Sequence, residues 1–159
     1  MATHTVGISE MKVTDCPDDI LVTYSLGSCI GVTIYDPEAM VGGMIHCMLP
    51  LSSHNKSKSE INPCMFTDTG IVKLLKAIYD LGGSRKRLIV KAAGASNLLD
   101  DQGLFMIGKK NHAIMRKVLW KNNILIASED VGGSKARTLY LHMATGITIV
   151  KSGGKEVEL

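Results

Sequence analysis

The sequence predicts an α+β domain built on a mixed, largely antiparallel system of β-sheets flanked by helices. Short runs typical of strands outnumber the two helical stripes, and hairpin turns stand near both ends of the chain. No strand–turn–helix stretch carries a GxGxxG or a Walker motif, so a doubly wound nucleotide-binding fold is not expected. The length of 159 residues fits a single domain over residues 1–159.

The first part of the chain carries four runs with the composition of strands. The predicted strands cover residues 6–13, 20–25, 29–35 and 41–49. In the third run Ile30, Val32 and Ile34 alternate with other residues, so their side chains should share one face of a sheet. Asp36-Pro37-Glu38 is a turn sequence and predicts a hairpin between the third and fourth runs, with Asp36 opposite Val41.

Two helices are predicted from apolar residues spaced three and four apart. The first takes Thr67 or Asp68 as its cap and ends near Leu81, where Gly82-Gly83 stops it. The second runs from Ile107 to about Asn122. The residues expected to face inward are Ile71, Leu74, Leu75 and Ile78 in the first helix and Ile114, Met115, Val118 and Leu119 in the second.

The remaining segments are a loop and four strands. Residues 51–63 are rich in Ser, Asn and Lys and are expected to form a mobile surface loop. Thr145-Gly146 marks the last hairpin turn. The strands predicted in the second part of the chain cover residues 88–93, 124–129, 137–143 and 147–151.

Charge and composition disfavour several classes of protein. The net charge of +3 is too low for a nucleic-acid-binding face, and the densest basic run, Arg85-Lys86-Arg87, is expected to be a solvated turn. The chain contains no run of about 18 apolar residues, and its first residues do not form a signal peptide. We therefore expect a cytoplasmic protein without a membrane-embedded segment, in which the four cysteines are thiols.

The alternation of side chains along a strand sorts the cysteines near His46. His46 should share a face with Met44 and Met48, whereas Cys47 points the other way and is expected to be a small buried residue. In the predicted hairpin Cys29 falls close to Met48, one diagonal step from His46 and within reach of its side chain.

Three interpretations of Cys29 remain open on the residues alone. The first is a buried structural cysteine, the most frequent role of a single cysteine. The second is a zinc ligand together with Cys16, His46 and Cys64, which is disfavoured because no CxxC or HxxxH pair is present. The third is a nucleophile with His46 as its base, an arrangement that usually needs a third group to orient the imidazole ring.

The run TYSLGSCIGVTIYDPEAMVGGMIHCMLP resembles the signature of the chemoreceptor glutamine deamidases, the CheD family of bacterial and archaeal chemotaxis. That family has a threonine, then LGSC, then a histidine shortly before a Leu-Pro pair. Later segments also resemble the family in the same order: MFTDTGIVKLLKAIYDLGG, VKAAGASN, MIGKKN and EDVGGSKARTLYLHMATGITIV. The chain departs from the family pattern at Ala93-Gly94-Ala95 and at Lys110, where an arginine is frequent.

The resemblance implies a catalytic role for three residues: Cys29 as nucleophile, His46 as base and Thr23 as the residue that orients His46. The reaction would hydrolyse receptor glutamine side chains to glutamate through a thioester, without a metal or another cofactor. The implied fold is like that of the cysteine deamidase toxins. The implied partners are methyl-accepting chemotaxis receptors and a CheC-type phosphatase. The alternative is a regulatory module that binds this phosphatase, with or without receptor methylesterase activity.

Two further residues are candidates from their position alone. Gly27 and Ser28 precede the nucleophile, and backbone N–H groups near Ser28 and Cys29 are candidates for an oxyanion hole. The sequence assigns no role to four other residues that match family segments, which are expected to serve turns and packing: Asn111, Gly132, Gly133 and Arg137.

Overall fold

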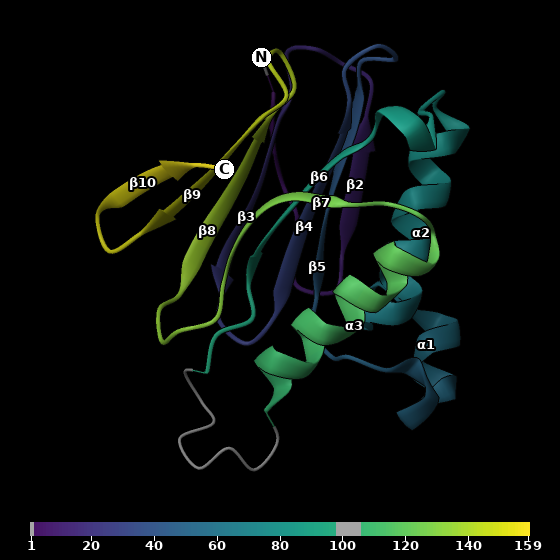
Figure 1. The fold of residues 1–159 in the computed structure, drawn as a ribbon, viewed down its shortest axis with the longest axis vertical. Coiled ribbons are helices and arrows are strands. Elements are labelled where there is room, and N and C mark those ends of the chain that lie inside the picture. The colour runs from purple at the N-terminus through teal and green to yellow at the C-terminus, as the bar shows by residue number, and fades with distance from the viewer. Residues whose placement is uncertain (1, 98–105) are drawn as a thin grey trace.

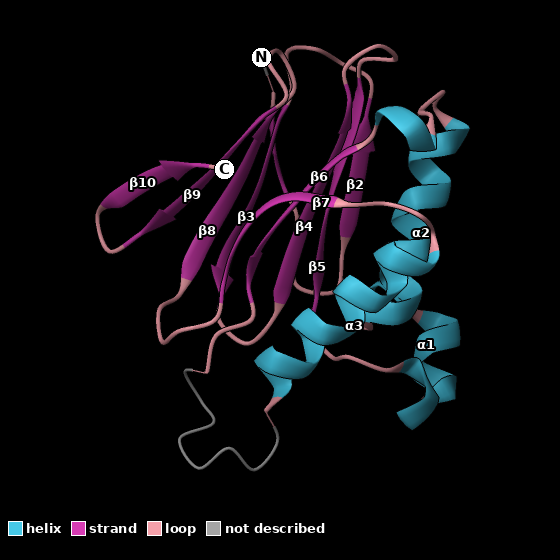
Figure 2. Ribbon diagram, in the orientation of Figure 1, coloured by secondary structure: helices cyan, strands magenta, loops and turns pink. Residues whose placement is uncertain are grey.

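The computed structural model describes residues 2–97 and 106–159. In the described residues ten strands form two five-stranded sheets, which pack face to face, and the helices cover the free face of one sheet (Figures 1 and 2). We call the helix-covered sheet the central sheet and the other the outer sheet. This is the predicted α+β class with mixed, largely antiparallel sheets flanked by helices. No helix among the described residues is both long and apolar enough to cross a membrane.

The outer sheet has the strand order β1-β3-β8-β9-β10. Its strands are β1 Thr3–Thr5, β3 Ile20–Leu26, β8 Arg137–His142, β9 Ile147–Ser152 and β10 Lys155–Glu158. Only β1 and β3 run parallel among the described pairs of this sheet. The sequence did not predict β10, because all four of its residues are exposed and no alternation of apolar and polar residues marks it.

The central sheet has the strand order β2-β5-β4-β6-β7. Its strands are β2 Met11–Thr14, β5 Val41–Cys47, β4 Ile30–Asp36, β6 Ile89–Gly94 and β7 Ile126–Val131. The β4–β5 hairpin has the predicted register, with Asp36 opposite Val41. The pair β6 and β7 is parallel and is connected through a helix, as parallel neighbours require.

Two predictions for the first part of the chain are wrong. Residues 6–13 do not form one strand: β1 and β2 lie in different sheets, and the chain between them bends at Ser9, whose φ is 64°. Residues 51–63 are not an irregular loop, because they hold the short helices η1 Ser52–His54 and α1 Lys56–Ile61 and the start of η2 Pro63–Met65. Neither η1 nor α1 buries a residue, so no apolar stripe announced them.

The two long helices are observed as α2 Thr67–Asp80 and α3 Ile107–Lys121. The predicted cap of α2 is wrong, because the N-cap position is Phe66 and no side chain bonds there. The Thr67 hydroxyl instead lies 2.9 Å from Oδ1 of Asn111, and the carboxylate of Asp68 accepts hydrogen bonds from Ser52. Both polar side chains therefore tie α2 to other segments.

The basic run before β6 is not simply a solvated turn. It forms the short helix η3 Arg85–Arg87, and the guanidinium of Arg87 lies 2.9 Å from the carboxylate of Asp36, which is fully buried. Although burial opposes its ionisation, hydrogen bonds from Arg87 and from three backbone N–H groups hold the pKa of Asp36 well below its usual range. The run therefore closes the turn end of the β4–β5 hairpin.

Two apolar cores lie on the opposite faces of the central sheet. Ile30, Val32 and Ile34 face the helices, as their alternation predicts, and Cys47 belongs to the same helix-side core. The second core lies between the two sheets, with Leu26 and Leu139 among its members, and Cys29 packs against it. Cys29 and Cys47 are therefore on different faces of the sheet.

Candidate active site

The β4–β5 hairpin brings the segments of Cys29 and His46 together. Gly31 is paired with His46 and Ile30 with Cys47, so continuing the register by one residue sets Cys29 opposite Met48. Paired residues and residues two apart on one strand share a face, so Cys29, Gly31 and His46 all project toward the space between the two sheets. Cys29 is half-buried there, whereas the His46 side chain has no exposed surface.

Thr23 of β3 reaches His46 from the outer sheet. Its hydroxyl oxygen lies 2.7 Å from Nδ1 of His46 and 2.6 Å from the carbonyl oxygen of Val6. A hydroxyl has a single proton, and the carbonyl of Val6 can only accept, so that proton is donated to Val6. Nδ1 of His46 must then carry a proton and donate to Thr23, which leaves Nε2 of the neutral ring unprotonated.

The free nitrogen of His46 has the properties of a base. Nε2 is buried and has no hydrogen-bond partner among the described residues. Burial lowers the pKa of His46 to about 4, so the ring is neutral near pH 7. A buried polar atom without a partner is costly, and such atoms are typical of sites that serve a reaction.

The thiol of Cys29 is also neutral at rest. Burial raises its pKa above the ordinary value, and its own backbone N–H partly offsets this effect. The site therefore does not hold a preformed pair of thiolate and imidazolium. Attack by this sulfur would require the thiol to lose its proton, and the imidazole of His46, on the same face of the sheet, could accept it.

The carbonyl groups of the turn that leads into Cys29 all accept hydrogen bonds from other segments. The N–H of Ser96 donates to the carbonyl of Gly27 at 2.8 Å, and the N–H of Ala95 donates to that of Cys29 at 2.7 Å. The carbonyl of Ser28 accepts a hydrogen bond of 2.9 Å from the Asn111 side chain. In the described part of the chain the N–H groups of Ser28 and Cys29 donate to no other residue, so both are available to an oxyanion.

The segment after β6 lies directly against this turn. Gly94 has a φ of 110°, and a Cβ added there would collide with the carbonyl oxygen of Cys29. Only glycine combines this backbone conformation with such a close approach. Gly94 therefore allows the next residue, Ala95, to donate its N–H to the carbonyl of Cys29.

Asn111, which the sequence left without a role, joins the segments that carry Cys29 and His46. It lies on the first turns of α3 and is fully buried. Its amide nitrogen donates to the carbonyls of Ser28 at 2.9 Å and Met48 at 3.1 Å, and its oxygen accepts from Thr67. One side chain thus fixes the residue before Cys29 to a residue just after His46. The sequence did contain a signal for its burial, because Asn111 stands four positions before Met115 and therefore lies on the apolar stripe of the helix.

Arg137 supports the segment after β6 from the outer sheet. Its side chain is almost fully buried and donates to the carbonyls of Gly94 and Gly132 and to the hydroxyl of Ser96. Its charge is balanced by the carboxylate of Asp130 at 3.2 Å. The expected role in turns and packing fits Arg137 and Gly132, which both bond the carbonyl of Gly94, next to the turn that contains Cys29. For Gly133, the carbonyl accepts from the N–H of Asn97.

The zinc interpretation does not fit the positions of its ligands. Cys16 is exposed, and its N–H bonds the hydroxyl of Thr14, while Cys64 packs in the helix-side core. Within residues 2–97 and 106–159 no group of three or more His, Cys, Asp or Glu side chains is placed to share a metal ion. Cys29 and His46 are therefore brought together without the other two cysteines.

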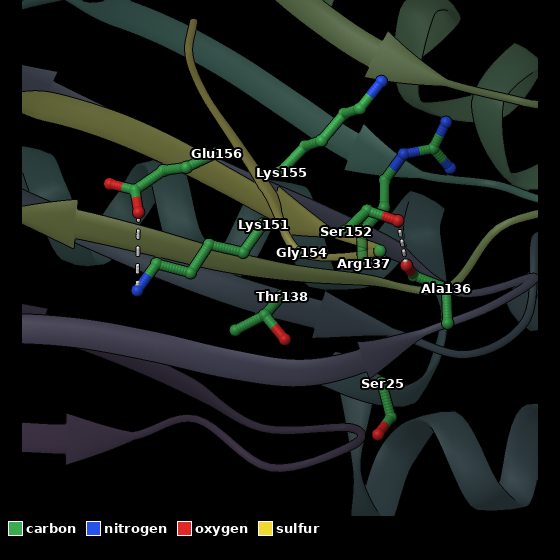
Figure 3. A pocket seen from close by; sticks show the side chains of 10 residues that line it. Ser25, Ala136, Arg137, Thr138, Lys151, Ser152, Gly154, Lys155 and Glu156 are labelled. Atoms are coloured by element: carbon green, nitrogen blue, oxygen red, sulfur yellow. Dashed lines mark hydrogen bonds and ion pairs between the residues drawn. The ribbon is translucent and has the colours of Figure 1, made fainter.

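A separate hollow of about 520 Å³ lies at one end of the outer sheet, lined by residues of β8, β9 and β10 and by Ser25 (Figure 3). Lys151 there pairs with Glu156, and the hydroxyl of Ser152 donates to the carbonyl of Ala136. Arg137 lines it, but Cys29 and His46 do not. We call it the outer-sheet hollow.

Comparison with known proteins gives consistent matches. The family model described as CheD chemotactic sensory transduction matches residues 48–152, a range that begins after Cys29 and His46. The probable chemoreceptor glutamine deamidase CheD of Solibacter usitatus is 46% identical over 154 residues, which are 97% of this chain and 91% of that protein. The probable chemoreceptor glutamine deamidase CheD 1 of Syntrophus aciditrophicus is 52% identical over 149 residues, 94% of this chain and 93% of that protein.

Among solved structures, the hypothetical protein YfiH of Bacillus licheniformis is similar with a TM-score of 0.48 and 14% identity. The similarity covers 78% of this chain and 49% of that chain.

Proposed function

The chain belongs to the CheD family, and we propose that it is a chemoreceptor glutamine deamidase that uses Cys29, His46 and Thr23. The reaction hydrolyses the side-chain amide of receptor glutamines to the carboxylate of glutamate and releases ammonia. We propose that a single domain over residues 1–159 carries this activity.

In the first step the sulfur of Cys29 attacks the amide carbon of the substrate glutamine. Nε2 of His46 accepts the thiol proton as the carbon–sulfur bond forms, because both groups are neutral at rest. The carbonyl oxygen of the substrate becomes an oxyanion. The N–H groups of Ser28 and Cys29, whose neighbouring carbonyls are all held by other residues, are the donors that stabilise it.

The tetrahedral intermediate then collapses to a thioester. His46, now protonated on Nε2, gives this proton to the departing nitrogen, so the leaving group is neutral ammonia rather than an amide anion. Thr23 continues to accept from Nδ1 of His46 throughout, which keeps the ring oriented without adding a negative charge to the site.

In the second step water hydrolyses the thioester. Neutral His46 takes a proton from the attacking water, the carbon–sulfur bond breaks, and the proton returns to the sulfur of Cys29. The products are the glutamate side chain and the original thiol. The cycle consumes one water molecule and needs no cofactor.

The observation that carries this proposal is the state of the His46 ring. Nδ1 is fixed by Thr23, and Nε2 is buried and unpartnered on the face of the sheet toward which Cys29 projects. A structural histidine in such a place would be expected to bond with both nitrogens.

The test is conversion of receptor glutamine to glutamate, followed by peptide mass spectrometry on the cytoplasmic fragment of a chemoreceptor. Cys29→Ala should abolish the conversion. Cys47→Ala, on the other face of the same sheet, should retain it. Full activity of Cys29→Ala would exclude the proposed nucleophile.

The family resemblance also supports a cytoplasmic location and a CheC-type phosphatase as a second partner. We expect the phosphatase to compete with the receptor for the site. Addition of purified phosphatase should then raise the apparent KM for the receptor fragment, whereas an unchanged KM would argue for separate surfaces.

A further inference from the structure

The exposed face of α3 is a continuous basic stripe. Its exposed residues recur every three or four positions along the helix and therefore form one ridge. They are Lys109, Lys110, Ala113, Arg116, Lys117, Trp120 and Lys121. We call this set the α3 stripe. It contains five basic residues and no acidic one.

The ridge carries five of the 18 basic residues of the chain and no acidic one, so it has a local excess of positive charge. The five basic residues exceed the net charge of +3 of the entire chain, so the remainder of the chain is slightly negative. Arg116 lies 3.6 Å from the carboxylate of Glu129, which also contacts His112. Across the described residues the other four basic side chains of the stripe make no ion pair, so their charge is available to a partner.

The stripe ends at an exposed tryptophan. Trp120 is the single tryptophan of the chain and is 75% exposed, and the neighbouring Leu125 is 84% exposed. The two residues line a hollow of about 420 Å³ between α3 and β7. Large apolar side chains left in water beside a hollow are typical of protein interaction surfaces.

The other end of the stripe adjoins the candidate active site. A second hollow of about 350 Å³ is lined by Leu49, Pro50, Ile107 and Lys110 among others. Leu49 and Pro50 follow His46 on the chain, and the residue after Lys110 is Asn111, which bonds the nucleophile turn. In Figure 1 α3 runs across the helical layer, with no other element drawn over it. Lys110 and Trp120 are about 15 Å apart along the helix axis.

We propose that the α3 stripe is the docking surface for an acidic helical segment of the receptor substrate, which it guides toward Cys29. This inference rests on the proposed function and adds the surface that recognises the substrate. A ridge of side chains at helical spacing packs into the groove of another helix, and its charge selects a partner of opposite sign. Trp120 and Leu125, at the end of the stripe away from the candidate active site, supply an apolar contact in addition to the charge.

An anionic membrane surface is the other partner that a basic helix with a tryptophan suggests. The structure favours a protein, because the stripe is a narrow ridge on a nearly neutral chain and leads to a hollow beside the catalytic segments. Membrane binding would not explain why the stripe lies beside the residues that are proposed to attack a substrate amide. Vesicle binding is therefore an arm of the test.

The test is the charge-reversal pair Lys110→Glu and Lys117→Glu, assayed for deamidation of a chemoreceptor cytoplasmic fragment. Because docking is lost and the chemistry is not, KM should rise about tenfold and kcat should stay within about twofold. The difference should shrink as ionic strength is raised to about 0.5 M, which screens exposed charges. Alkylation of Cys29 by iodoacetamide, followed on its own peptide, should be unchanged.

The matched control is the pair Lys86→Glu and Lys155→Glu. It changes the net charge by the same amount at exposed positions outside α3, one of them in the outer-sheet hollow. This pair should behave as the unmodified protein does. An equal rise of KM in both pairs, or a rise in the control pair alone, overturns the proposal.

Binding is also measured without turnover. Trp120 emission should shift to shorter wavelength on addition of a receptor fragment that lacks tryptophan, and the stripe pair should weaken this titration about tenfold. No shift overturns the docking surface even if deamidation is confirmed. A shift without deamidation by the unmodified protein contradicts the proposed function alone. Loss of binding to phosphatidylglycerol vesicles in the stripe pair, with an unchanged receptor titration, assigns the stripe to lipid and overturns the proposal.

Discussion

The hydroxyl of Thr23 donates its single proton to the carbonyl of Val6 and accepts the proton on Nδ1 of His46. The two residues belong to different sheets, and their contact fixes the tautomer of a buried imidazole ring. In the proposed triad a neutral hydroxyl would perform the orienting task that a carboxylate or amide performs in other enzymes.

Thr23→Val should lower kcat about 10- to 100-fold, because the valine has nearly the same shape but cannot accept from Nδ1 of His46. Thr23→Ser keeps the hydroxyl and should retain most of the activity. The measurement is receptor deamidation by both variants under saturating substrate. Equal activity of the valine and serine variants would remove Thr23 from the triad.

The acid limb of the pH profile should lie well below the ordinary titration of histidine. Burial lowers the pKa of His46 to about 4, so the ring stays unprotonated and able to accept a proton down to about pH 5. The profile of kcat/KM for the free enzyme should therefore fall only as the pH approaches about 4. An acid limb near the ordinary histidine pKa of about 6.5 would contradict this state of the ring.

The same pKa shift predicts a pH dependence of stability. The unfolded state binds a proton on His46 below about 6.5, whereas the folded state binds it only below about 4. The free energy of unfolding should thus decrease as the pH falls from about 6.5 to about 4. Urea unfolding at several pH values measures it, and His46→Gln should remove this part of the dependence. An unchanged slope in that variant would assign the effect to other groups.

Asn111→Ala should leave the carbonyls of Ser28 and Met48 without their donor. We expect a loss of about 1–3 kcal/mol in the free energy of unfolding and a fall in kcat with little change in KM. Asn111→Asp should also be impaired, because a carboxylate of similar size cannot donate to either carbonyl. The rate at which iodoacetamide alkylates Cys29 should differ from that of the unmodified protein in both variants.

The control for Asn111 is Asn122→Ala, an exposed residue at the other end of the same helix. Among the described residues its side chain bonds only the carbonyl of Val118 in that helix. It should lose some stability without affecting the reactivity of Cys29. If Asn111→Ala changed stability alone, its role would be structural.

Gly94→Ala should slow the reaction of Cys29 as well as destabilise the protein, because the added methyl group meets the carbonyl of Cys29. Gly82→Ala is the matched control. Gly82 has a similar φ of 103°, but nothing lies within 4 Å of its added Cβ. The strain of a positive φ is common to both variants, and the main difference between them is the collision with the carbonyl of Cys29. Equal alkylation rates of Cys29 would show that the contact does not matter.

Local patterns in the sequence predicted the two long helices and the faces of strands β4 and β5. A turn at Asp36 and an alternation of Ile30, Val32 and Ile34 suffice to set the register of a hairpin, because both act over a few residues. This register put Cys29 near His46 and turned Cys47 away. Helix α1 and strand β10 were not predicted, because neither buries a residue and so neither shows a periodic pattern of apolar side chains.

The tertiary structure alone decided the chemistry of the site. The proton on His46 is placed by Thr23, and the proton on Thr23 is placed by Val6, so the tautomer depends on three segments that meet only after the sheets pack. Asn111 is separated from Ser28 by 83 residues, and its two donors find their acceptors only when α3 docks. Hydrogen bonds are short and directional, so sequence spacing cannot predict which polar groups pair once distant elements are packed together. The sequence by itself placed Cys29 near His46, and packing determined which nitrogen of His46 holds a proton.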